Sequence, residues 1–180
     1  MIIVGLTGSF GTGKTTTARM FKRMGAHIIS ADKIAHRFIP SPITRRKVAK
    51  VVFKRKRYVE LICKILHPLI ISQIKTEIKK VKPTKKVVVI DAPLLFETGL
   101  DKIVDVCVVV KAKRKNQIER LKKSRRLTTL NILRRIKFQL PLKNKLYKAD
   151  FVIDNNGSFY NTYIQVKEIY RKLIKREPTI

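Results

Sequence analysis

The strongest structural signal in this chain is the run Gly8-Ser9-Phe10-Gly11-Thr12-Gly13-Lys14-Thr15. It matches G-x-x-x-x-G-K-[ST], the pattern of the phosphate-binding P-loop, in which a strand enters the loop and a helix leaves it. The apolar residues 1–6 supply the strand, and apolar residues at helical spacing follow the loop until Gly25. A chance match in a glycine-containing turn would lack this context. The sequence therefore predicts a P-loop.

The residue types in the loop suit a nucleoside triphosphate and its metal. Glycines at positions 8, 11 and 13 allow backbone angles that turn successive N–H groups inward around a phosphate at a helix N-terminus. We expect Lys14 to reach the β- and γ-phosphates and the Thr15 hydroxyl to ligate Mg²⁺. The loop by itself predicts nucleoside triphosphate binding and no particular acceptor.

Length and composition fit one domain. The chain has 180 residues, 44% of them hydrophobic, so we expect a single domain over residues 1–180. Its apolar runs are too short to cross a bilayer. Cys63 and Cys107 lie in apolar runs without a metal-binding pattern. We therefore expect buried free thiols, a cytoplasmic protein and no membrane association.

The chain is strongly basic, with 42 lysines and arginines against 12 acidic residues and a net charge of +30. Such a charge could attract nucleic acid, serve a polyanionic substrate or reflect the composition of the source proteome. The basic residues are spread over the predicted helices, aromatic residues make up only 7%, and tryptophan is absent. Because no aromatic surface for stacking bases is evident, we expect no specific nucleic-acid partner.

The rest of the chain alternates short apolar strands with helices. Strands are predicted at 26–32, 86–91, 105–110 and 151–153, and helices at 33–38, 42–53, 117–125, 129–138 and 159–175. Residues 58–66 and 69–81 form either one kinked helix or two joined helices, because His67-Pro68 interrupts the pattern. Together with the first strand, this alternation predicts an α/β fold: a five-stranded parallel sheet between two layers of helices, the layout of a P-loop kinase.

Two acidic residues follow predicted strands, at the edge where open α/β sheets bind ligands. Asp32 could accept a proton from an attacking hydroxyl or help to arrange Mg²⁺, and it could also cap the helix that follows. Asp91 could contact Mg²⁺ through water, or it could form the turn before Pro93. The sequence leaves both pairs of alternatives open.

Arginines occupy two other predicted helical regions. Arg45 and its basic neighbours lie in the first turns of the 42–53 helix, where positive charge opposes the helix dipole, so they face solvent or point at an anion. Arg120, Arg125, Arg126 and Arg135 could close over phosphates. For any single one of these arginines, a solvated helical face is the simpler explanation.

Several segments together resemble dephospho-CoA kinases. They follow one another in order over nearly the whole chain, and beside the P-loop they are Gly5-Leu6-Thr7-Gly8, Ala31-Asp32, Ile65-Leu66-His67-Pro68, Asp91 with Pro93-Leu94-Leu95-Phe96-Glu97, Gln117-Ile118-Glu119-Arg120-Leu121, Arg135-Ile136 with Gln139, and Ala149-Asp150-Phe151-Val152-Ile153-Asp154-Asn155. The resemblance implies phosphorylation of the ribose 3′-hydroxyl of dephospho-CoA, the last step of coenzyme A synthesis, with ATP and Mg²⁺ as cofactors. The alternatives are another P-loop kinase for a nucleoside or nucleotide, and an RNA-directed P-loop protein.

The resemblance also implies roles for single residues. Asp32 would be the base toward the ribose hydroxyl, and Asn155 would lie beside the adenine. The position of the family's lid arginine is occupied here by Ser124. We expect the next residue, Arg125, to take over its role, so that Lys14 and Arg125 are both catalytic residues. The ATP phosphate loop would comprise Gly8, Gly11, Thr12, Gly13, Lys14, Thr15 and Thr16. The acceptor would be bound by Asp32, Arg45, His67 and Leu94.

For such a kinase we also expect a particular strand order and particular regions for the acceptor and the lid. We expect the strand order 2-3-1-4-5, acceptor-side helices over about 39–82, and a lid with its following helix over about 115–145. Dephospho-CoA would be the small-molecule partner. The chain would be a monomer or a weak homo-oligomer.

Overall fold

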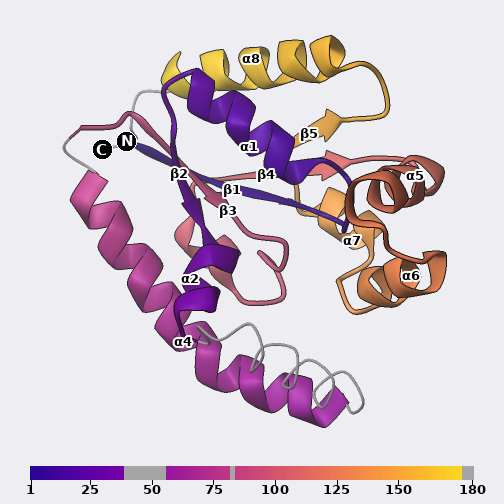
Figure 1. Ribbon diagram of the computed structural model, residues 1–180. Helices are drawn as coiled ribbons and strands as arrows, with labels where there is room; N and C mark the ends of the chain where they lie inside the picture. Colours follow the sequence, from indigo (N-terminus) through magenta and orange to yellow (C-terminus); the bar gives the residue numbers. More distant parts are fainter. Residues whose placement is uncertain (39–55, 82–83, 176–180) are drawn as a thin grey trace.

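A computed structural model describes residues 1–38, 56–81 and 84–175, with the side chains of 56–65 and 125 left out of the description (Figure 1). Its centre is one parallel sheet of five strands in the order β2-β3-β1-β4-β5. The strands are β1 (Ile2–Gly8), β2 (His27–Ser30), β3 (Val87–Asp91), β4 (Val106–Lys111) and β5 (Phe151–Asp154). The predicted fold class and strand order are therefore confirmed.

Helices cover both faces of the sheet (Figure 1). On one face, α1 (Lys14–Arg23) and α8 (Phe159–Lys175) pack together, and Phe21 and Val166 share a buried cluster with Val4 of β1. On the other face, α2 (Ala31–Phe38) and α4 (Lys56–Val81) pack together, and Ile34 and Ile74 share a second cluster with the inner strands. Because both faces are covered, β3 is buried along its whole length, which explains its continuous run of valine and isoleucine.

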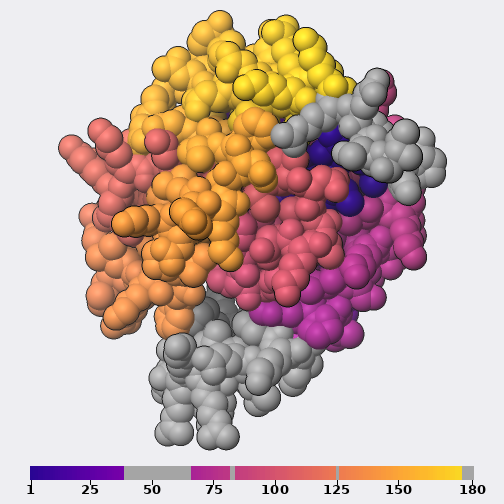
Figure 2. All heavy atoms as spheres, turned by 180° about the vertical axis from the view of Figure 1, so that it is seen from behind, coloured from indigo at the N-terminus to yellow at the C-terminus, as the bar shows by residue number. Residues whose placement is uncertain are grey.

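Three elements lie beside the carboxyl end of the sheet. These are α5 (Arg114–Arg125), α6 (Thr129–Lys137) and the short α7 (Leu142–Tyr147). In Figure 2, seen from behind, their residues form the left side of the molecule. We call α5 and α6 the lid, because these are the two helices that the sequence predicts to close over the phosphates.

The helices agree with the sequence in most places. The open choice around Pro68 is settled in favour of one continuous helix, because α4 runs through that proline. The expected helix at 42–53 lies outside the described residues. The sequence predicted a helix after the lid without bounds of its own, and it did not predict the 3₁₀ helix η1 (Leu100–Ile103). In α7 the buried residue is Lys145, so no apolar periodicity marks where this helix begins and ends.

Two findings concern the helices as membrane spans and the cysteines. None of their helices is long and apolar enough to span a membrane. Cys107 is a buried free thiol, and its burial, together with the charge of Asp150, raises its pKa to about 11. The side chain of Cys63 lies outside the description.

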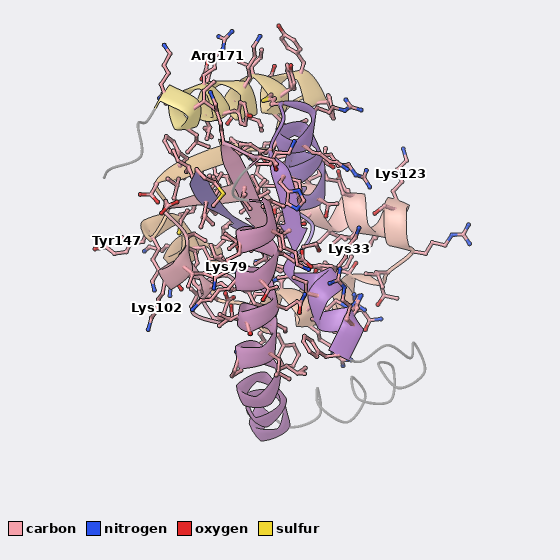
Figure 3. The ribbon with its side chains drawn as sticks, turned by 90° about the vertical axis from the view of Figure 1, so that its left-hand side faces the viewer. Lys33, Lys79, Lys102, Lys123, Tyr147 and Arg171 are labelled. Atoms are coloured by element: carbon pink, nitrogen blue, oxygen red, sulfur yellow. The ribbon has the colours of Figure 1, made fainter. Side chains whose placement is uncertain are left out.

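The basic surface is dispersed. Figure 3 shows Lys33, Lys79, Lys102, Lys123 and Arg171 pointing in different directions, from α2, α4, η1, α5 and α8 respectively. A charge spread in this way produces a diffuse positive field rather than a groove.

Candidate active site

The loop after β1 has the geometry of an anion cradle. Gly11 and Gly13 have φ values of 86° and 95°, which place them in the left-handed region that favours glycine. The N–H groups of Thr16 and Thr17 both donate to the Gly13 carbonyl, at 3.0 and 3.1 Å, and so begin α1 directly after the loop. The N-terminus of α1 therefore points into the loop, where an anion is stabilised.

Neighbouring atoms leave no room for side chains in the loop. A Cβ atom on Gly13 would lie 1.9 Å from Asn155 Nδ2, and one on Gly11 would lie 2.6 Å from Leu121 Cδ1. A Cβ on Gly8 would lie 2.5 Å from the carbonyl oxygen of Val110. At positions 11 and 13 the positive φ favours glycine, and an added Cβ would also have to displace the Leu121 or Asn155 side chain.

Lys14 and Asp91 form an ion pair across the carboxyl ends of β1 and β3. Both side chains are only 11% exposed. The parallel pairing of Leu6 with Asp91 places the carboxylate beside the start of the loop. Asp91 therefore neutralises the P-loop lysine in this structure, a role that the sequence did not indicate.

A cleft of about 600 Å³ opens over the loop, within the size range typical of ligand sites. All seven residues of the expected phosphate loop line it, and so does Asp32. From the lid, Arg120, Leu121, Lys123 and Ser124 complete the wall. The structure thus brings together the loop, one carboxylate and several cationic side chains, as phosphoryl transfer requires.

Asp32 lies where the cleft meets a second pocket. It occupies the first turn of α2 directly after β2, and its side chain is exposed. The Lys33 N–H is capped by Ser30, whose Oγ accepts it at 3.3 Å. Ser30 therefore supplies the cap that had been an alternative role for Asp32.

The second pocket has a volume of about 90 Å³ and mostly apolar walls. Three of the four expected acceptor residues, Asp32, His67 and Leu94, meet in its lining. Burial lowers the pKa of His67, so its imidazole is neutral at pH 7. Arg45, the fourth, lies outside the described residues.

The lid arginine that the structure places in the cleft is Arg120. Its Nη2 donates to the Asn155 carbonyl at 2.8 Å. Its Nη1 is buried without a hydrogen-bond partner among the described residues, so both N–H groups of this atom are unsatisfied. Arg125 ends α5, but its side chain is not described. The sequence predicts Arg120 among four arginines that could close over phosphates, and its signal is its place in the segment 117–121. Residue spacing alone does not distinguish it from the other three, since exposed helical arginines are common.

Asn155 holds the loop in place. Its Nδ2 donates to the Thr12 carbonyl at 2.7 Å, and its Oδ1 accepts from Thr162 Oγ1 at 2.8 Å. Contact of Asn155 with an adenine stays a prediction. The structure adds a role for its side chain in fixing the P-loop.

The fold and the cleft define the class of this protein: it is a P-loop kinase. Solved structures with the same fold include TT1252 from Thermus thermophilus, with a TM-score of 0.82 and 24% identity over 96% of this chain and 97% of that one. A shikimate kinase from Acinetobacter baumannii has a TM-score of 0.62 and 16% identity, over 99% of this chain and 96% of that one.

Sequence comparison narrows the class to one family. The dephospho-CoA kinase family model matches residues 2–42 and 41–161. A dephospho-CoA kinase from Aquifex aeolicus is 34% identical over 193 residues, which cover 96% of this chain and 97% of that protein. One from Arabidopsis thaliana is 34% identical and covers 94% of this chain and 82% of that protein. The chain belongs to the dephospho-CoA kinase family.

Gly13→Ala tests the geometry of the loop. The new Cβ would collide with Asn155 and hold a φ that L-residues avoid, so we expect ATP affinity to fall by about tenfold or more. Gly99→Ala is a matched control, because Gly99 has a φ of 72° but no atom within 4 Å of its added Cβ. Equilibrium titration should show normal ATP binding for Gly99→Ala. Normal binding by Gly13→Ala would contradict this description of the loop.

Proposed function

We propose that the chain transfers the γ-phosphoryl group of ATP to the ribose 3′-hydroxyl of dephospho-CoA, giving coenzyme A and ADP. The observation that carries this proposal is that Asp32 lines both the P-loop cleft and the smaller acceptor-side pocket. A phosphoryl donor in the cleft and a hydroxyl acceptor in the pocket would therefore meet at one carboxylate. Family membership supports the choice of acceptor, and no feature of the described residues favours a nucleoside kinase or an RNA-directed protein.

Asp32 is the base in this proposal. It accepts the proton of the ribose hydroxyl as the oxygen bonds to the γ-phosphorus and the bond to the leaving ADP oxygen breaks. Its place in the first turn of α2 supports this role, because the helix fixes its backbone and the side chain lines the cleft. Ser30 accepts the Lys33 N–H at the start of the same helix.

Lys14 and the loop stabilise the charge of the transferred group. The backbone N–H groups hold the phosphates, and Lys14, beside Asp91, would contact the β- and γ-phosphate oxygens. From the lid, Arg120 lines the cleft, and its Nη1 is unsatisfied among the described residues. We retain Arg125 as the second lid arginine and add Arg120 beside it.

The residues present fit Mg²⁺ held mainly by the nucleotide. Among the described residues no group of three or more potential metal ligands is found, whereas Thr15 lines the cleft at the start of α1. Mg²⁺ commonly takes one or two protein oxygens and completes its shell with phosphates and water. The Thr15 hydroxyl would be its protein ligand, and the ion would neutralise charge on the phosphates.

The small pocket would receive part of the acceptor. His67 and Leu94 would contact the acceptor in the small pocket, and Arg45 would approach it from 39–82, the acceptor-side region. The lid and the helix that follows it would comprise about 115–145 of a single domain, 1–180. We also infer a cytoplasmic monomer or weak homo-oligomer without a specific nucleic-acid partner and without membrane association.

Lys14→Ala should lower turnover at saturating ATP by about 10²–10³, because it removes a charge that matters most in the transition state. The melting temperature should also fall, since Asp91 loses its partner. Steady-state kinetics and thermal unfolding should be measured together. Unchanged turnover would exclude a catalytic role for the P-loop lysine.

Asp32→Asn keeps the size of the side chain but removes the proton acceptor. We expect transfer to slow by about 10²–10⁴ while ATP affinity and melting temperature stay unchanged. Asp105→Asn is the control, since Asp105 is exposed and its carboxylate accepts the Ile3 N–H near the amino end of β1. Joint loss of ATP affinity and stability in Asp32→Asn would identify Asp32 as a structural or metal-anchoring residue.

The dispersed charge generates a separate expectation about RNA. Binding should be independent of sequence, with a Kd of about 10⁻⁴–10⁻⁶ M at physiological salt, and added RNA should leave kinase turnover unchanged. Fluorescence anisotropy with two labelled RNAs of equal length and different sequence measures this. Sub-micromolar binding that survives physiological salt would favour the RNA-directed alternative.

A further inference from the structure

A direct hydrogen bond joins the segment that follows the lid helix α6 to the P-loop. The Phe10 N–H donates to Oε1 of Gln139 at 2.8 Å, and Gln139 follows α6 by two residues. The guanidinium of Arg135, in the last turn of α6, lies 5.4 Å from the centre of the Phe10 ring. Two side chains from the lid side therefore contact one loop residue.

With this hydrogen bond, both polar groups of the Ser9–Phe10 peptide have a partner. The Ser9–Phe10 peptide presents a carbonyl on one side and an N–H on the other. Its carbonyl, Ser9 O, accepts from both the N–H and the Oγ1 of Thr12, at 3.2 and 2.9 Å. Its N–H is held by Gln139. Rotation of this peptide would break the hydrogen bonds of both its carbonyl and its N–H. Gln139 therefore restricts the orientation of the Ser9–Phe10 peptide, and with it the direction in which the loop continues toward Gly11.

The segment that carries Gln139 is itself anchored beside the cleft. We call residues 138–145 the lid root. The Leu140 N–H donates to Glu97 Oε1 at 2.7 Å, and Lys145 Nζ lies 2.9 Å from the same oxygen. Lys145 Nζ also donates to the Pro93 carbonyl at 2.6 Å, and Pro93 lines the cleft.

The anchor is costly to break because Lys145 is fully buried. A buried ammonium needs hydrogen-bonded partners, and removal of either member of such a pair is costly. Burial lowers the pKa of Lys145, and Glu97 opposes this shift. The lid root is thus held at a fixed position relative to the loop that follows β3.

We propose that Gln139 is a positioning residue for phosphoryl transfer: by holding the Ser9–Phe10 peptide from the anchored lid root, it keeps the P-loop in its phosphate-binding orientation and couples the loop to the lid. Leu121 of α5 packs against Gly11 from the other lid helix, so both lid helices act on adjacent loop residues. The inference rests on the proposed kinase function, but its main consequence concerns ATP binding alone.

The experiment compares three single substitutions. Gln139→Met removes the acceptor at nearly constant size, and Gln139→Glu retains an acceptor. Asp105→Leu is the control, since it also deletes one side-chain acceptor of a backbone N–H, at 2.7 Å, but near the amino end of β1. For each protein we would measure the Kd of ATP by equilibrium titration, the KM values of both substrates, the melting temperature, and tryptic cleavage of the lid with and without ATP.

Gln139→Met should weaken ATP binding by about 5- to 15-fold, the effect of one hydrogen bond in the bound loop. The KM for dephospho-CoA should be unchanged. In the wild type we expect ATP to slow tryptic cleavage in α5 and α6, and in Gln139→Met we expect this protection to be lost. Gln139→Glu should stay within about threefold of the wild type in ATP affinity. Asp105→Leu should bind ATP normally even where its melting temperature falls.

Three results would overturn the inference: wild-type ATP affinity in Gln139→Met, equal impairment of Gln139→Met and Gln139→Glu, or equal impairment of Gln139→Met and Asp105→Leu. If Gln139→Met does not fold, Gln139→Asn takes its place, because the shorter side chain cannot reach Phe10. Normal ATP affinity and normal protection of the lid in Gln139→Asn would then overturn the inference. Failure of the proposed function would look different, because the wild type would then bind ATP without phosphorylating dephospho-CoA.

Discussion

The P-loop binds phosphate only if its backbone turns inward at Gly11 and Gly13, and much of the surrounding structure serves that constraint. Both glycines have positive φ, and neither has room for a side chain. Asn155 holds the loop from the turn after β5, and Gln139 holds it from the lid root. Residues more than 120 positions away in the sequence therefore stabilise a loop near the N-terminus.

The ion pair between Lys14 and Asp91 holds the P-loop lysine at the edge of the sheet where the loop begins. Two largely buried charges compensate each other at the carboxyl ends of adjacent strands. A bound triphosphate would offer Lys14 a second anionic partner beside Asp91.

The sequence predicted what depends on local pattern. The five apolar strands, the P-loop and the position of Asp32 were readable because strand burial and phosphate binding require particular residues at particular spacing. It did not predict the bounds of α7, because buried Lys145 interrupts the apolar pattern. It also did not predict the contacts of Asn155, Gln139 and Asp91. Those contacts depend on how distant segments meet in space, which residue spacing does not encode. Arg120 was visible as a residue of the lid, but only the cleft distinguishes it from other helical arginines.

The ribose 3′-hydroxyl of dephospho-CoA is the proposed acceptor of the phosphate, and one measurement tests this directly. ADP release should be followed for dephospho-CoA and for its analogue without the ribose 3′-hydroxyl, with phosphorus NMR of the product. We predict one ADP for each new phosphomonoester at the ribose 3′ position, and no ADP above background with the deoxy analogue. Equal ADP release from both acceptors, or faster release with a simple nucleoside, would contradict the account.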